Sequence, residues 1–236
     1  MAHPSPRDIL PPDFLTRHDL VHRLYLRPLH GLTPAQPWAP LTDAEWAALS
    51  PILAAQGCGL AEAPRAGRPM ADPRARLDAI FRAVTLKHPA GGRAPWRLLP
   101  ERFGKPDTIS RTHRRWAHAH LWARLLAEVA RPGCPPALAA LTHRICCAFR
   151  RAIRIMGLRG IVLARRLGLF SALPAPSACL PDPDLSELAM PALRRFVESL
   201  RADLGWRPPK LLFRGLHALL RLAGGRSRIP RWMEPA

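Results

Sequence analysis

The stretch PWRLLPERFGKPDTISRTHRRW, residues 95–116, carries the pattern that decides the fold. Its first half predicts a short helix that Gly104 closes, because glycine is common just past a helix C-terminus. After a tight Lys105-Pro106 turn, Asp107 can cap a second helix. A short helix, a tight turn and a basic helix, in that order, are typical of a helix-turn-helix domain.

The second helix of this stretch is predicted to have a buried face and a basic face. Ile109, Trp116 and one of Thr112 or His113 recur at helical spacing, which indicates a buried stripe. The side chains that fall on the other side are Ser110, Arg111, Arg114, Arg115 and His118. This separation of apolar and basic residues indicates a helix that packs on one side and is open on the other.

The basic face is predicted to contact DNA. The N-terminal part of a recognition helix reaches base edges in the major groove, while flanking arginines hold phosphates. The residues that we predict to make these contacts are Thr108, Ser110, Arg111, Arg114, Arg115, Arg97, Arg102 and Lys105. A solvated basic face that packs against nothing is the alternative interpretation of the same pattern.

Further helices are predicted on both sides of this stretch. Upstream, Thr42 and Glu45 have the spacing of a capping box, and Asp72-Pro73 has the form of a helix start. The stripes predicted to be buried are Trp46, Leu49 and Leu53, then Leu77, Ile80, Phe81 and Val84, and downstream Leu121, Trp122, Leu125, Leu126 and Val129. No period-two alternation is long enough for a sheet, so we expect an all-α fold.

The chain is predicted to have three parts. Residues 1–40 form a proline-rich arm, irregular apart from one short helix, and residues 41–131 form the helix-turn-helix domain. Residues 132–236 form a basic helical tail of unknown role. Apolar stripes in the tail predict helices over 138–152, 193–204 and 212–220, with a linker over 174–183.

The charge balance favours a polyanionic partner. The 236 residues include 36 basic and 17 acidic side chains, for a net charge of +19, and only Lys87, Lys105 and Lys210 are lysines. Arginine forks match phosphate oxygens and guanine edges, so nucleic acid is the first expectation. A coding bias toward GC-rich DNA is the alternative, since it also raises the arginine and proline content.

Several short motifs give the chain a family resemblance. They are Leu41 to Trp46 (LTDAEW), Gly67-Arg68-Pro69, Pro95 to Gly104 (PWRLLPERFG), Arg114-Arg115-Trp116 and Leu121-Trp122. Over about residues 41–129 the sequence resembles the N-terminal helix-turn-helix domain of DDE-type transposases from the insertion-sequence four/five group. The resemblance implies a domain that holds the DNA at the ends of an insertion element.

The sequence departs from that family at three places. The loop between Thr85 and Pro95 is longer than the family pattern, and His113 stands where an aromatic residue is expected. The family's catalytic domain holds two metal ions on three acidic residues, but here no aspartate or glutamate occurs between Glu128 and Asp182. We therefore predict no catalytic residue, no bound metal and no cofactor.

Histidine and cysteine patterns do not predict a metal site. His113, His118 and His120 have no cysteine or carboxylate at ligand spacing, so core and surface roles are expected. The five cysteines are odd in number and form no C-x-x-C pair, which suits a reducing cytoplasm. A membrane span is not expected, because the most apolar stretch, 153–173, carries four arginines.

We therefore expect a cytoplasmic DNA-binding protein related to transposases, without the catalytic domain and without a small-molecule substrate. Its expected partner is double-stranded DNA.

Two other functions stay open: an active or trans-complemented transposase, and a basic interaction or membrane-surface protein that uses the tail. The arginines that suggest the latter are Arg144, Arg150, Arg151, Arg154, Arg159, Arg165 and Arg166. A tail decayed or read out of frame is a further alternative. The sequence predicts neither the DNA sequence bound nor the oligomeric state.

Overall fold

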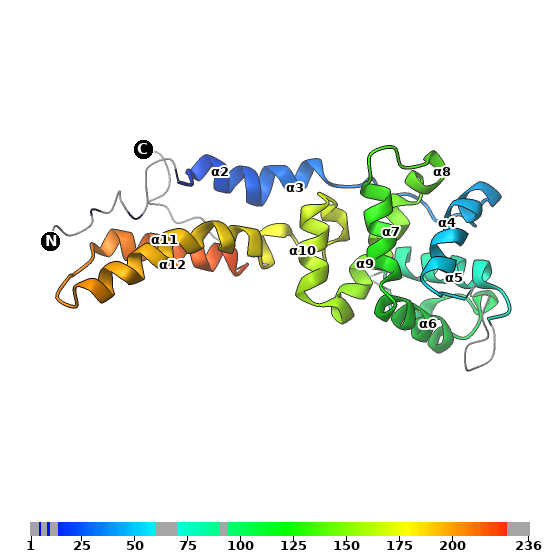
Figure 1. Ribbon diagram of the computed structural model, residues 1–236. Coiled ribbons are helices and arrows are strands. Elements are labelled where there is room, and N and C mark those ends of the chain that lie inside the picture. The colour runs from blue at the N-terminus through cyan, green and yellow to red at the C-terminus, as the bar shows by residue number, and fades with distance from the viewer. Residues whose placement is uncertain (1–4, 6–8, 10–13, 60–69, 90–93, 226–236) are drawn as a thin grey trace. The chain divides into compact units, whose positions relative to one another are not determined.

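The computed structural model describes residues 5, 9, 14–59, 70–89 and 94–225. Over these residues the chain consists of helices and turns and contains no β-strand, which confirms the all-α prediction. The chain divides into two compact units, one formed by residues 31–174 and one by residues 1–30 with 175–236 (Figure 1). These limits differ from the predicted ones, which fall after residues 40 and 131.

The unit of residues 31–174 contains the 95–116 stretch. Its helices are connected by short turns, several of them closed by a glycine with positive φ. The elements are α4 (Asp43–Ala55), α5 (Pro73–Thr85), η2 (Trp96–Leu98), η3 (Glu101–Phe103), α6 (Pro106–His118), α7 (Leu121–Ala130), α8 (Pro136–Ala139), α9 (Thr142–Met156), α10 (Leu158–Arg166) and η4 (Phe170–Ala172).

Helix α9 forms the centre of this unit. It packs against α5, α6 and α7 (Figure 1). Ile145, Phe149 and Ala152 on its inner face are fully buried. The sequence predicts this stripe correctly but places it in a separate tail. Because α9 fills the core beneath the predicted DNA-binding helices, a boundary after residue 131 would cut through the packing that holds them.

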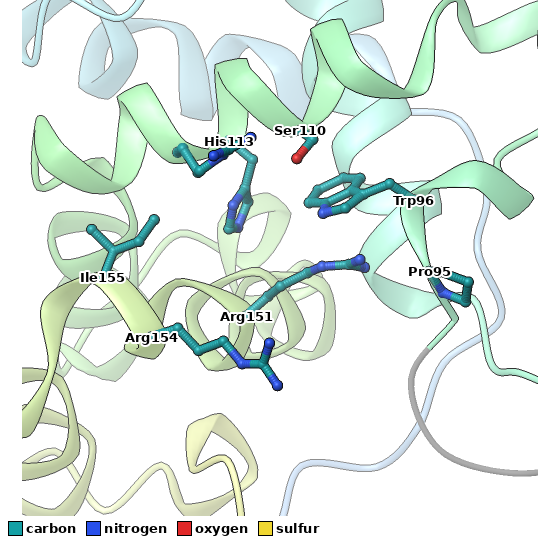
Figure 2. A pocket seen from close by; sticks show the side chains of 8 residues that line it. Pro95, Trp96, Ser110, His113, Arg151, Arg154 and Ile155 are labelled. Carbon is teal, nitrogen blue, oxygen red and sulfur yellow. The ribbon is translucent and has the colours of Figure 1, made fainter.

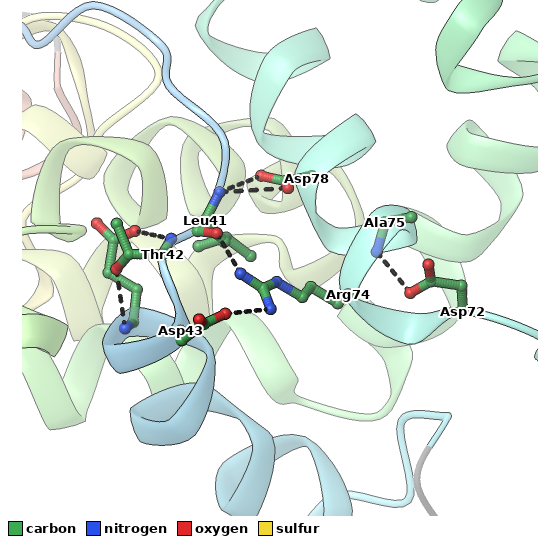
Figure 3. Close-up of polar contacts among 8 residues, drawn as sticks. Leu41, Thr42, Asp43, Asp72, Arg74, Ala75 and Asp78 are labelled. Atoms are coloured by element: carbon green, nitrogen blue, oxygen red, sulfur yellow. Dashed lines mark hydrogen bonds and ion pairs between the residues drawn. The ribbon is translucent and has the colours of Figure 1, made fainter.

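Two predicted helix starts are confirmed where α4 meets α5 (Figure 3). The backbone N–H of Thr42 donates to Glu45 at 2.8 Å and that of Glu45 to the Thr42 hydroxyl at 3.2 Å, which is a capping box. The Asp72 carboxylate accepts from the N–H of Ala75 at 2.8 Å. Arg74 then joins the two helices through its ion pair with Asp43 at 2.7 Å.

Replacing Thr42 with alanine should lower the free energy of unfolding by about 1 kcal/mol, because the N–H of Glu45 loses its acceptor. Urea unfolding followed by tryptophan fluorescence measures this effect. Thr42→Ser keeps the hydroxyl and should stay close to wild type. Equal losses in the two variants would contradict a stabilising role for the cap.

The predicted helix over 95–104 is wrong in detail. Two 3₁₀ turns, η2 and η3, occupy it instead, and Leu99 between them is extended at φ −66° and ψ 128°. Pro100 explains the break, because proline lacks an N–H and excludes the helical conformation from the residue before it. Asp107 is likewise not the cap of α6: Lys105 takes the cap position, Pro106 begins the helix and Asp107 lies in its first turn.

The tail helices also differ from their predicted limits. The helix predicted over 138–152 is two helices, α8 and α9, and the hydroxyl of Thr142 donates to the carbonyl of Ala139 at 2.6 Å where they join. Helix α9 ends at Met156, and Gly157 follows it with a φ of 63° and a ψ of −144°, a combination that glycine adopts readily. At the junction of α8 and α9, the hydrogen bond from Thr142 gives the backbone an alternative to one continuous helix.

The second unit, residues 1–30 with 175–236, is a separate helical assembly. Its elements are α2 (Arg17–Val21), η1 (His22–Leu26, a π-helical turn), α3 (Arg27–His30), η5 (Ser177–Cys179), α11 (Pro183–Ala202) and α12 (Lys210–Ala223). The predicted arm is therefore helical from residue 17 to residue 30, and the predicted linker over 174–183 contains the turn η5. The predicted helix over 193–204 begins earlier, at Pro183, and ends at Ala202, which leaves Leu204 93% exposed.

An ion pair and two clusters of buried apolar residues hold this second unit together. Arg23 donates to both carboxylate oxygens of Asp182, at 2.7 and 2.8 Å, and Asp182 also caps α11. The pKa of Arg23 is raised, chiefly by its hydrogen bond to Asp182. Such a two-pronged, largely buried pair fixes the position of the first helices against the start of α11.

Candidate nucleic-acid interface

The inner face of α6 is fixed by packing and by two hydrogen bonds. Ile109, Thr112, His113 and Trp116 are all buried, as the sequence predicts. His113 donates from Nε2 to the carbonyl of Ala148 on α9 at 3.0 Å, since a carbonyl oxygen can only accept. Its own carbonyl accepts from the indole N–H of Trp122 at 3.1 Å. These contacts determine which side of α6 is open to solvent.

His113 fills the place of an aromatic residue. Its ring stacks on Trp122, with centroids 5.1 Å apart and an interplanar angle of 27°, and it also contacts Trp96 at 5.4 Å. The side chain is only 2% exposed. The histidine at this position packs as an aromatic ring within the inner stripe of α6 and satisfies its buried N–H.

Five of the residues that the sequence predicts to contact DNA lie on α6, toward its outer face. Thr108, Arg111, Arg114 and Arg115 are exposed, and Ser110 is half-buried at one edge. None of these three guanidinium groups forms an ion pair with a residue that the structure describes. Their charges are therefore available to an anionic partner.

The other predicted contacts lie just before α6. Arg97 is in η2, Arg102 is in η3 and Lys105 is the cap residue of α6, and all three are exposed. The guanidinium of Arg102 lies 5.0 Å from the ring centre of its neighbour Phe103. Since η2 packs against α6, the basic residues of the turns and of the helix belong to one folded substructure.

Sequence reasoning missed the contribution of α9 to this region. A pocket of about 390 Å³ lies between α6 and α9 and is lined by Ser110, Arg114, Arg151, Arg154 and Trp96, among others (Figure 2). The sequence groups Arg151 and Arg154 with the tail. Only the packing of α9 against α6, which joins residues distant in the chain, could have revealed that they belong here.

The tail is less basic on its surface than its sequence suggests. Arg144, Arg151 and Arg165 are buried, whereas the remaining arginines of the predicted basic region are exposed: Arg150, Arg154, Arg159 and Arg166. Arg151, 8% exposed, donates to the carbonyl of Ala83 at 3.2 Å and stacks 3.8 Å above the ring centre of Trp96. A long arginine stem can be buried when its polar end finds such partners.

The tryptophan and histidine side chains of this region are divided between the core and the surface. Trp116 and Trp122 are buried, while Trp46 and Trp96 are half-buried. His118 and His120 are exposed, and His120 adopts a φ of 60° between α6 and α7. Among the described residues, no group of three or more histidine, cysteine or acidic side chains could hold a metal ion.

A cysteine and a histidine on α9 come close but do not form an activated nucleophile. Cys147 Sγ lies 3.7 Å from His143 Nε2. Burial raises the pKa of Cys147 and lowers the pKa of His143, and burial raises the pKa of Cys146 to about 11. Both thiols therefore stay protonated near neutral pH, and the protonated form is unreactive.

Alkylation with iodoacetamide should label Cys179 and leave Cys146 unmodified in the folded protein. Cys179 is exposed, whereas Cys146 is fully buried with a raised pKa. Peptide mass spectrometry after brief reaction at a pH of about 8 measures the difference. In urea both cysteines should react, and fast labelling of Cys146 without urea would contradict the packing of α9.

Part of the chain that contains α6 matches a known protein family. Residues 41–126 match the family model described as "Putative transposase of IS4/5 family (DUF4096)". This segment is therefore similar to the N-terminal segment of IS4/5-type transposases. No curated protein and no solved structure matches the chain significantly.

The transposase-like segment, residues 41–126, contains α4, α5, α6 and the first half of α7. It includes every residue that the sequence predicts to contact DNA. It does not include α9, which completes its core. One of the motifs behind the resemblance, Gly67-Arg68-Pro69, lies outside the described residues, as do residues 90–93 of the long loop.

In the part of the chain that the structure covers, no helix combines the length and hydropathy needed to cross a bilayer.

Proposed function

We propose that the chain is a DNA-binding protein related to insertion-element transposases, and that α6, preceded by the 3₁₀ turns η2 and η3 in place of the predicted short helix, is its recognition helix. The observation that carries the proposal is the outer face of α6, where Arg111, Arg114 and Arg115 are exposed within the transposase-like segment. A helix of this kind fits the major groove of B-DNA, which is about 12 Å wide. The expected partner is double-stranded DNA, namely the ends of an insertion element.

The proposal gives different roles to the residues of this surface. Thr108 and Ser110, near the start of α6, contact base edges, while the arginines of α6 contact guanines or phosphates. The basic side chains of the preceding turns hold phosphates and set the orientation of α6 on the duplex; they are Arg97, Arg102 and Lys105. Asp107, exposed in the first turn of α6, opposes phosphate approach there and limits how the duplex can lie.

The proposed function contains no strand-transfer step. Residues 129–181 contain no aspartate or glutamate, whereas the two-metal chemistry of phosphodiester transfer uses carboxylate ligands. We therefore propose that the chain binds DNA ends without cutting them, and that it does so in the cytoplasm. A Mg²⁺-dependent strand-transfer assay with the full chain should stay blank, and product formation would contradict this part of the proposal.

Fluorescence anisotropy with the full chain and a labelled duplex tests DNA binding itself. The affinity should fall linearly with salt on a logarithmic plot, with a slope of about 0.9 for each phosphate contacted. The full chain is required because α9 lies beyond the transposase-like segment and belongs to its core. Negligible binding at low salt would contradict the proposal.

A further inference from the structure

Positively charged side chains line the pocket between α6 and α9 (Figure 2). Arg114 enters it from α6, and Arg151 and Arg154 enter it from α9. None of its eight lining residues is acidic. The hydroxyl of Ser110 adds a neutral hydrogen-bond donor, so the polar groups of the pocket match an anion with several oxygen acceptors.

Part of this pocket is organised before any ligand enters. Arg151 is held by its stacking on Trp96 and by its hydrogen bond to the carbonyl of Ala83 on α5. Trp96 and His113 contact each other beside it, with ring centroids 5.4 Å apart. Groups that are already fixed lose little entropy on binding, which strengthens a site of this kind.

The volume of the pocket and its apolar lining residues indicate which chemical group is attached to the anion. A volume of about 390 Å³ lies within the range of about 300–1,000 Å³ that is typical of ligand pockets. Pro95 and Ile155 provide apolar surface next to the arginines. A phosphate ester with its attached sugar offers both an anion and a partly apolar body, whereas a free inorganic anion would leave the apolar side unused.

We propose that this pocket binds one phosphate group of the DNA backbone together with its sugar. Arg114 and Arg154 contact the phosphate directly, Ser110 donates a hydrogen bond, and Arg151 supplies fixed positive charge. This inference rests on the proposed function, because Arg114 belongs both to the outer face of α6 and to the pocket. It adds α9, outside the transposase-like segment, to the DNA-binding surface.

Arg154→Ala in the full chain tests the pocket without touching the outer face of α6. Its affinity for a labelled duplex should fall roughly tenfold, as expected for one charge-assisted hydrogen bond. The slope of the salt dependence should fall by about 1, the value for one lost phosphate contact. Arg159→Ala on α10 is the matched control, because Arg159 is also an exposed arginine and does not line the pocket.

The outcomes separate the two proposals. If wild type binds the duplex and Arg154→Ala loses no more affinity or slope than Arg159→Ala, the pocket assignment is overturned and α6 keeps its role. If wild type does not bind duplex DNA at all, both proposals are overturned. A free nucleotide, thymidine 5′-monophosphate, is the second probe. If it binds the pocket while Arg154→Ala leaves duplex binding unchanged, the backbone phosphate is not the ligand.

Discussion

Replacing Phe149 with alanine should lower the free energy of unfolding of residues 31–174 by about 3–5 kcal/mol. The ring of Phe149 is fully buried on α9, in the core that α5, α6 and α7 share. The substitution removes apolar contacts and leaves a cavity that close-packed neighbours cannot fill. Because domains are stable by only about 5–15 kcal/mol, this loss is a large part of the total.

Urea unfolding followed by tryptophan fluorescence measures this change. Five of the seven tryptophans lie within residues 31–174, so the signal reports mainly on that unit. Leu158→Ala on α10 is the matched control, since Leu158 is 51% exposed and its truncation should change stability by less than about 0.5 kcal/mol. Equal effects of the two substitutions would show that α9 is not part of this core.

The double substitution of Arg111 and Arg115 by alanine should weaken duplex binding by about thirtyfold or more. Each arginine contact with DNA is worth about 1–3 kcal/mol, and the two losses add when the contacts are independent. Both side chains are exposed on the outer face of α6 and neither lines the pocket. The variant should therefore fold as wild type does and lose affinity alone.

A control with equal loss of charge separates specific contact from general attraction. Arg159→Ala combined with Arg201→Ala removes two exposed arginines from α10 and α11 and lowers the net charge by the same amount. It should weaken binding much less, because neither arginine lies on α6 or lines the pocket. If both double variants bind equally weakly, the net charge of the chain is responsible and α6 has no special role.

The sequence predicts what depends on neighbours within one helix. The buried stripe of α6 from Ile109 to Trp116 follows from spacing alone, and the capping box of Thr42 follows from residues three apart. Pro100 could also have been used to predict the break between η2 and η3, because its effect is local. These features need no knowledge of the rest of the chain.

Contacts between distant residues could not be predicted in this way. An arginine such as Arg151 is usually a surface residue, and only the meeting of α9 with α5 and η2 gives it the carbonyl of Ala83 and the ring of Trp96. The same meeting moves α9 from a presumed tail into the core and creates the pocket. Spacing along the chain contains no signal for a contact of this range.

The most direct test of the central proposal is a map of DNA-induced changes in the backbone amide NMR signals of the full chain. On titration with duplex DNA, we expect the largest shifts over residues 105–118, with further shifts around Arg154 and Trp96. Residues of α11 and α12 should change little. Shifts concentrated on α11 and α12, or none on α6, would contradict the assignment of α6 as the recognition helix.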